Sequence, residues 1–140
     1  MRMFLFLLAV FSLSAAAEVY PYKVNRVIDG DTVEIQTPFL PAPLKPVLAL
    51  RILGVDTPEK GKRAKCSSEA AKGELATKFA IEKIQSATLI QVEIIDWDKY
   101  GGRILGDLFI DEQRLSDLLI QNGHARAYDG GTKESWCNEV

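Results

Sequence analysis

One long stretch of helical periodicity, at about residues 67–85, interrupts a chain whose other segments have the pattern of short strands. Apolar side chains recur in it every three or four residues and form two neighbouring rows: Ala71, Leu75 and Phe79, and beside them Ala76, Ala80 and Ile84. This spacing is typical of a helix with one buried face. One such helix among short strands predicts an α+β fold that is mainly β.

Three strand patterns come before this helix and two come after it. Apolar and β-branched residues dominate them, and turn residues or prolines separate them. They cover residues 22–28, 32–37, 47 to about 55, 92–95 and 103–110, and a short helix that ends at Gly123 follows. This order is expected of a five-stranded barrel of the oligonucleotide-binding kind, the OB fold, with one long helix and one or two short ones.

The first 17 residues have the pattern of a secretory signal peptide. Arg2 precedes an apolar run at residues 4–13, and three alanines follow before the polar Glu18. The run is too short to span a bilayer comfortably, and small residues at its end are typical of a cleavage site. We therefore expect a secreted or periplasmic protein without stable membrane association, in which residues 18–140 form one domain. A retained membrane anchor is the alternative.

Net charge gives no support for a nucleic-acid partner. The whole chain has 17 Lys and Arg against 19 Asp and Glu, so loss of Arg2 with the leader leaves one basic residue fewer and a slightly acidic protein. A nucleic acid would therefore have to be bound by a local basic patch or through a metal ion.

Two cysteines, Cys66 and Cys137, remain in the mature chain. Export would place them where thiols are commonly oxidised, so we expect them to form one disulfide. Zinc binding is the alternative, but it would need more nitrogen and sulfur ligands than two cysteines and the single His124 provide. A single histidine also excludes a two-histidine ribonuclease mechanism.

Acidic and arginine side chains collect at the ends of the predicted strands. They lie in Asp29-Gly30-Asp31-Thr32, at Arg51, in Asp56-Thr57-Pro58-Glu59, and at Arg103 after a glycine-rich turn. Each alone has a simple structural explanation, such as a turn, a helix cap or a solvated strand position. Together they could supply what phosphodiester hydrolysis needs: hard oxygen ligands for a cation, a group that handles water, and donors for the phosphate oxygens.

The order of these motifs resembles the staphylococcal nuclease (thermonuclease) family. Residues 24–128 carry the likeness, in three motifs that cover residues 27–33, 51–59 and 98–103. The resemblance implies an OB-fold, Ca²⁺-dependent phosphodiesterase that cuts DNA and RNA and leaves 3′-phosphates. We expect it to act as a monomer.

The resemblance also assigns a metal site. It implies that Asp31 and Asp56 bind Ca²⁺ through their carboxylates and that Thr57 binds it through its carbonyl oxygen. Asp29 is expected to support these ligands from behind, where an acidic group can orient ligands and water. A plain turn residue is the alternative for Asp29.

The remaining family roles fall on one carboxylate and two arginines. Glu59 corresponds to the residue that acts as general base or positions the attacking water, and Arg51 and Arg103 correspond to the phosphate-binding arginines. The family commonly has Asp-Lys-Tyr-Gly-Arg, whereas this chain has an additional Gly102 before Arg103. In a strand the extra residue would turn Arg103 to the other face, unless a bulge at Gly102 absorbed it.

Other residues are candidates for contact with nucleic acid. Lys60, Lys62, Arg63 and Lys65 follow Glu59 and would meet an entering phosphate backbone, although a solvated loop would look the same. Tyr100 and Tyr128 could stack on a base or simply be half buried. We interpret Trp97 and Trp136 as packing residues.

Two other functions are compatible with this fold. The first is a barrel that binds an oligonucleotide or a protein without cutting, but such a protein need not keep the full set of acidic and arginine residues. The second is a structural domain of the cell envelope held by its disulfide, which only the acidic net charge favours.

Overall fold

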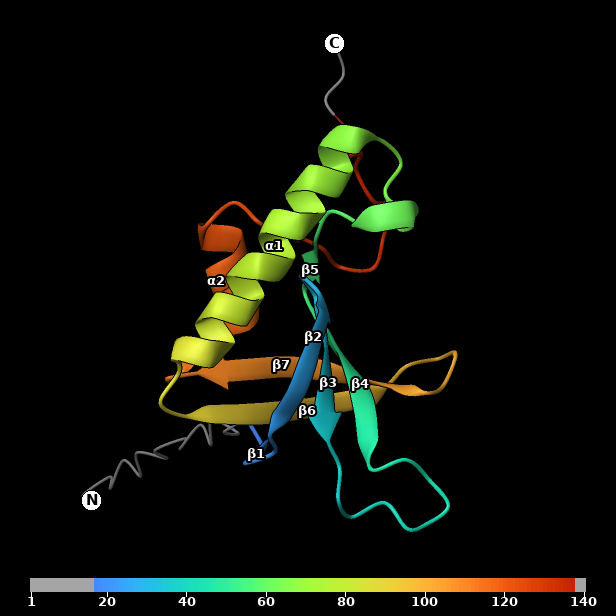
Figure 1. Cartoon of the computed structure of the whole chain (residues 1–140), viewed down its shortest axis with the longest axis vertical. Helices are drawn as coiled ribbons and strands as arrows, with labels where there is room; N and C mark the ends of the chain where they lie inside the picture. Colours follow the sequence, from blue (N-terminus) through green and yellow to red (C-terminus); the bar gives the residue numbers. More distant parts are fainter. Residues whose placement is uncertain (1–16, 138–140) are drawn as a thin grey trace, which may run out of the picture.

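A mixed sheet forms the centre of residues 17–137, the part of the chain that the computed structural model describes (Figure 1). Its strands, in spatial order, are β1 (Val19–Tyr20), β6 (Ile90–Trp97), β7 (Arg103–Ile110), β4 (Val47–Ile52), β3 (Thr32–Gln36) and β2 (Val24–Asp29). β4 and β7 run parallel, and the other neighbours in this order are antiparallel. The mixed sheet and its helices confirm the predicted α+β fold.

Two α-helices lie side by side on the sheet (Figure 1). The long helix α1 (Ser67–Ser86) matches the predicted helix and contacts β2, and the short helix α2 (Leu115–Gln121) contacts β7. A 3-10 turn, η1 (Gly61–Arg63), precedes α1. The two rows of apolar residues in α1 are unequal, since Ala76 and Ala80 are buried whereas Leu75 is exposed.

Alternation of buried and more exposed residues along β3 and β4 contributes much of the core. In β3, Val33 and Ile35 are fully buried, whereas Gln36, the last residue of the strand, is exposed. The same alternation buries Leu50 and Ile52 of β4. Side chains from β6, β7 and α2 complete one cluster, among them Val92, Leu108, Leu115 and Leu119. Because this core fixes the register of β3 and β4, it also fixes the residues at their ends.

The predicted third strand, residues 47 to about 55, is wrong at its end. β4 stops at Ile52, and Gly54 turns the chain with a φ of +79°. Val55–Asp56 then form a separate strand, β5, which pairs with β9 (Arg126–Ala127). The break therefore directs Asp56 away from the main sheet and toward the C-terminal part of the chain.

The other short strands were not predicted. β1 pairs with β6, and β8 (Gln113–Arg114) pairs with β7. Two-residue strands have too little alternation to be recognised in a sequence, so only their partners identify them. The predicted signal peptide lies outside the described residues except for Ala17. Within residues 17–137 no helix has the length and apolar character needed to cross a membrane.

Candidate active site

Asp31, Arg51 and Thr57 come together from three separate segments. Asp31 lies in the turn between β2 and β3, and its Oδ2 lies 2.6 Å from a terminal guanidinium nitrogen of Arg51 in β4. The backbone N–H of Thr57 donates to the same Asp31 oxygen at 3.4 Å. Arg51 also donates to the carbonyl oxygens of Ile52 and Val55, each at 3.1 Å. The fold therefore holds this guanidinium in one place at the centre of the site.

The carboxylate of Asp31 lies in an unfavourable environment for a negative charge. Burial raises its pKa to about 6; the Arg51 guanidinium opposes this shift, and the nearby carboxylate of Asp29 adds to it. Two buried carboxylates beside each other are unfavourable unless positive charge compensates them. A cation at this place would do so.

Asp56, the second candidate calcium ligand, is also buried, and only 4% of its surface is exposed. Its Oδ1 lies 3.0 Å from the ammonium nitrogen of Lys133, and its Oδ2 accepts a hydrogen bond of 2.9 Å from the indole Nε1–H of Trp136. Both partners come from the C-terminal segment. Neither residue was predicted to belong to the site, and Trp136 had been interpreted as a packing residue.

The donor set fits Ca²⁺. Asp31 and Asp56 offer hard, buried carboxylate oxygens, and Thr57, which follows Asp56 directly, adds a backbone carbonyl. Within residues 17–137, only Cys66, Glu69 and Cys137 form a group of three acidic, cysteine or histidine ligands within 4.8 Å of one another. Among the described residues, Asp31 and Asp56 thus do not belong to such a group, and the candidate calcium ligands are two carboxylates and a carbonyl.

Glu59 lies near Asp56 and Thr57, at the start of the segment that leads to η1. Its backbone N–H donates to Glu69 of α1 at 3.2 Å, and its carboxylate lies 3.3 Å from the guanidinium of Arg63. Arg63 also forms an ion pair of 2.6 Å with Asp29. Arg63 therefore bridges the first acidic motif and Glu59, so it has a role within the protein beside the predicted contact with nucleic acid.

A glycine in α1 allows Glu59 to lie so close to the helix. A Cβ atom at Gly73 would overlap the carbonyl group of Glu59 and crowd the N–H of Lys60. We expect Gly73→Ala to lower the free energy of unfolding by on the order of 1 kcal/mol. Overpacking costs about 1–3 kcal/mol, and the better helix propensity of alanine offsets up to about 1 kcal/mol of this. Chemical denaturation measures the difference.

Ala71→Gly provides the control, because Ala71 is exposed in the same helix. It should show the propensity effect alone, a loss of about 0.5–1 kcal/mol. A Gly73→Ala variant that is more stable than the wild type would contradict the close packing of α1 against Glu59.

Arg103 lies on the same face of the sheet as Arg51. In the parallel pair of β4 and β7, Arg103 is opposite Ala49 and Arg51 is opposite Leu105. Arg103 and Leu105 are two residues apart, as are Ala49 and Arg51, so all four side chains point to one side. The extra Gly102 does not disturb this arrangement, because it lies in the turn with a φ of +75° and β7 begins only at Arg103.

The two arginines and both candidate tyrosines line one open cavity of about 760 Å³. Asp98 holds the guanidinium of Arg103 there, with its Oδ2 2.7 Å from Nε. Tyr100 is 82% exposed, and the ammonium of Lys99 lies 5.0 Å from its ring centre. Tyr128 is half buried and donates its hydroxyl to the carbonyl oxygen of Gly131.

Glu59 lines a second cavity, next to the first. This cavity of about 300 Å³ also contains Asp56, Thr57 and Trp136. Lys133 lines both cavities. The arginines and tyrosines thus line one cavity and Glu59, Asp56 and Thr57 the other, whereas Asp31 and Asp29 line neither.

The basic loop presents its other side chains to solvent. Lys62 and Lys65 are exposed, and Lys60 is half buried. The backbone N–H of Lys65 donates to Glu69 at 2.7 Å, which fixes the end of the loop to α1. The two ammonium groups are thus accessible beside the cavity that contains Glu59, as a phosphate contact would require.

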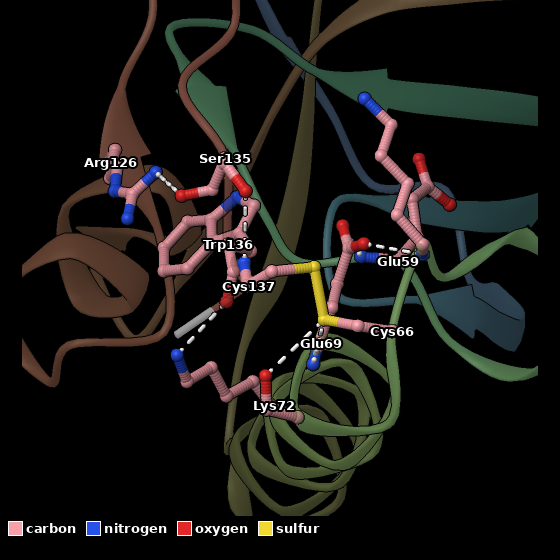
Figure 2. The surroundings of a disulfide bond; sticks show 10 residues. Glu59, Cys66, Glu69, Lys72, Arg126, Ser135, Trp136 and Cys137 are labelled. Atoms are coloured by element: carbon pink, nitrogen blue, oxygen red, sulfur yellow. Dashed lines mark hydrogen bonds between the residues drawn. A yellow bond between two sulfur atoms is a disulfide. The ribbon is translucent and has the colours of Figure 1, made fainter. Parts of the chain in front are cut away.

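The predicted disulfide between Cys66 and Cys137 is confirmed, with 6.0 Å between their Cα atoms. Cys66 is the residue that caps the N-terminus of α1 (Figure 2). Because the two sulfurs are bonded to each other, they are not available to zinc, and the alternative of zinc ligation is wrong.

Comparison with known proteins adds to this geometry. Residues 49–138 match the family model described as staphylococcal nuclease homologue. The chain belongs to this family. The matched range contains Arg51, Asp56, Glu59 and Arg103, whereas Asp31 lies before it.

The chain is also similar to two curated proteins, both of which are longer than the part that matches it. The uncharacterized protein MJ1439 of Methanocaldococcus jannaschii is 32% identical over an alignment of 132 residues. The match covers 79% of this chain and 60% of that protein. The SPbeta prophage-derived endonuclease YokF of Bacillus subtilis is 31% identical over 122 residues, which cover 83% of this chain and 38% of YokF. The chain thus spans less than two thirds of the length of either relative.

Proposed function

We propose that this staphylococcal nuclease homologue is a Ca²⁺-dependent phosphodiesterase that cleaves DNA and RNA and leaves 3′-phosphates. The observation that carries the proposal is the meeting of Asp31, Arg51 and Thr57 beside the buried Asp56. A binding protein without catalysis has no evident use for buried carboxylates that lie next to a fixed guanidinium. The family membership and the endonuclease name of YokF support the same activity.

Each chemical role falls to a group with a suitable environment. Ca²⁺, held by Asp31, Asp56 and the Thr57 carbonyl, would neutralise charge on the phosphate. Glu59, whose side chain is 39% exposed, can accept a proton from a water molecule. Arg51 and Arg103 share one face of the sheet and can donate to phosphate oxygens as negative charge develops on them.

The proposal also includes the closure of the sheet, the oligomeric state and the cellular location of the protein. We take the five longer strands, β2, β3, β4, β6 and β7, to form a closed OB-type barrel. We take residues 1–17 to be a cleaved signal peptide, residues 18–140 to form one domain, and the protein to act as a monomer in the periplasm or the medium. The disulfide supports export, because such bonds persist in oxidising compartments.

A cleavage assay tests the function. Single-stranded DNA and RNA, labelled at the 5′ end, are incubated with the purified oxidised protein in Ca²⁺, in a calcium chelator, and in chelator followed by excess Ca²⁺. We expect cleavage only where Ca²⁺ is free, and products that phosphatase treatment shifts on a sequencing gel. Binding of the labelled strands without any cleavage in Ca²⁺ would instead identify a non-catalytic oligonucleotide-binding domain.

A further inference from the structure

The C-terminal segment, residues 133–137, lies across Asp56. Lys133 contacts one carboxylate oxygen of Asp56 and Trp136 contacts the other. Both oxygens of this buried side chain therefore have partners far along the chain, since Trp136 and Asp56 are 80 residues apart. Asp56 itself belongs to β5, whose pairing with β9 places it next to the segment that follows β9. The C-terminal segment is therefore part of the candidate site.

Three anchors hold Trp136 in place (Figure 2). The disulfide joins the next residue, Cys137, to the cap of α1. The ammonium of Lys72 in α1 donates to the carbonyl oxygen of Trp136 at 3.0 Å. On the other side, Arg126 of β9 donates to the carbonyl oxygen of Ser135 at 2.9 Å, and its guanidinium lies 3.8 Å from the centre of the Trp136 ring.

These anchors distinguish Trp136 from Lys133. The Lys133 side chain is 46% exposed, and besides Asp56 its ammonium has only one partner among the described residues, the ring of Tyr128, whose centre lies 5.5 Å away. The backbone of Trp136 is tied to α1 through Lys72 and the neighbouring disulfide, and its ring packs against Arg126 of β9. Its Nε1–H is a donor only, so the bond to Oδ2 restrains the orientation of the Asp56 carboxylate.

Packing alone does not explain this position. Trp136 is half buried, with its ring against the guanidinium of Arg126, and it does not belong to the hydrophobic core. An oxygen that accepts one hydrogen bond retains a second lone pair for a cation. Groups that orient a metal ligand in this way typically change metal affinity by about 10–100-fold when they are removed.

We propose that Trp136 is a positioning residue for Asp56 as a calcium ligand, and that the disulfide between Cys66 and Cys137 keeps it in that position. The inference rests on the proposed function, because it requires that Asp56 binds Ca²⁺. It adds that the C-terminal segment is needed to complete the site.

The test compares two proteins that differ only at residue 136, in one of which the side chain cannot donate a hydrogen bond. Both carry Trp97→Phe, so that residue 136 is the only other tryptophan position, and one also carries Trp136→Phe. Phenylalanine keeps an aromatic ring over Arg126 but cannot donate to Asp56. Calcium affinity is measured by isothermal titration calorimetry on oxidised protein, and thermal unfolding in chelator confirms that both proteins are folded.

We expect the single variant to bind Ca²⁺ as the wild type does and the double variant to bind it about 10–100-fold more weakly. Equal affinities, within a factor of two, would overturn the inference while the proposed function stood. Absence of calcium binding by the wild type would overturn both, so the two failures are distinguishable.

A second measurement does not depend on folding of the double variant. In the Trp97→Phe protein all tryptophan fluorescence comes from Trp136. Its N–H donates to the carboxylate of Asp56, which would bind the added Ca²⁺. Its emission should therefore change during a Ca²⁺ titration, with the same midpoint as the calorimetry. An emission spectrum that is unchanged at saturating Ca²⁺ would contradict the contact and overturn the inference.

Discussion

Glu59→Gln should lower kcat for cleavage of single-stranded DNA by about 10²–10⁴-fold, the usual contribution of a general base. Glutamine has nearly the shape of glutamate but cannot accept the proton of the attacking water. The backbone bond from residue 59 to Glu69 does not involve the side chain, so the local fold should persist. The ion pair with Arg63 is lost, but it is largely exposed and contributes little to stability. Single-turnover cleavage in saturating Ca²⁺ measures the effect.

Glu134→Gln is the matched control. Glu134 lines the same cavity as Glu59, but its side chain is 83% exposed and its ion pair with Arg126 is long, at 3.9 Å. This variant should cleave at the wild-type rate, which would separate a role of the Glu59 carboxylate from a general change of charge. If Glu59→Gln retained the wild-type kcat, Glu59 would not be the group that handles the water.

Replacement of Cys66 and Cys137 by serine should lower the free energy of unfolding by about 4 kcal/mol. The two cysteines are 71 residues apart, and removing a crosslink over so long a loop gives the unfolded chain much more conformational freedom. Domains of this size are stable by only about 5–15 kcal/mol, so the loss is a large part of the total. Denaturation in guanidinium chloride, followed by circular dichroism, measures it.

Wild-type protein in excess dithiothreitol should unfold at the same denaturant concentration as the double serine variant, and the variant itself should not respond to the reductant. The comparison separates the loss of the crosslink from the change of side chains. A decrease in the free energy of unfolding of less than about 1 kcal/mol would mean that strain in the native state offsets the effect of the crosslink on the unfolded chain, contrary to the chain-entropy account.

The elements with long periodic patterns could be predicted from the sequence. The spacing of Ala76 and Ala80 predicts the buried face of α1, and the alternation around Val33 predicts the buried face of β3. These patterns are local, since each depends on one element that turns a single face to the core. The motifs with Asp31, Arg51 and Asp56 could likewise be located, because they lie at the ends of such elements.

The direction of Arg103 could not be predicted, because it depends on a pairing between strands that are far apart in the sequence. One additional glycine in a strand reverses the side chains that follow, whereas the same glycine in a turn does not. Only the register of Ala49 opposite Arg103 decides between the two. The roles of Arg103, Glu59 and the calcium ligands remain predictions that the experiments above test.

The contact between Trp136 and Asp56 was missed for a related reason. Two-residue strands such as β5 and β9 leave no periodic signal, and their pairing alone brings the end of the chain to Asp56. A tryptophan next to a cysteine is usually interpreted as a packing residue. The available signal was that Cys137 could be joined to Cys66, which itself follows Glu59 by only a few positions.

The bond between Cys66 and Cys137 also matters for where the protein is made. Cytosolic glutathione and thioredoxin keep cysteines as thiols, so a newly synthesised chain would have a loose C-terminal segment and, on the inference above, weak calcium affinity. On the proposed export, the disulfide would form only after the chain has left the cytosol. For a laboratory this favours recombinant expression in the periplasm or oxidative refolding, because preparations from a reducing cytosol would understate the calcium affinity that we propose for the protein.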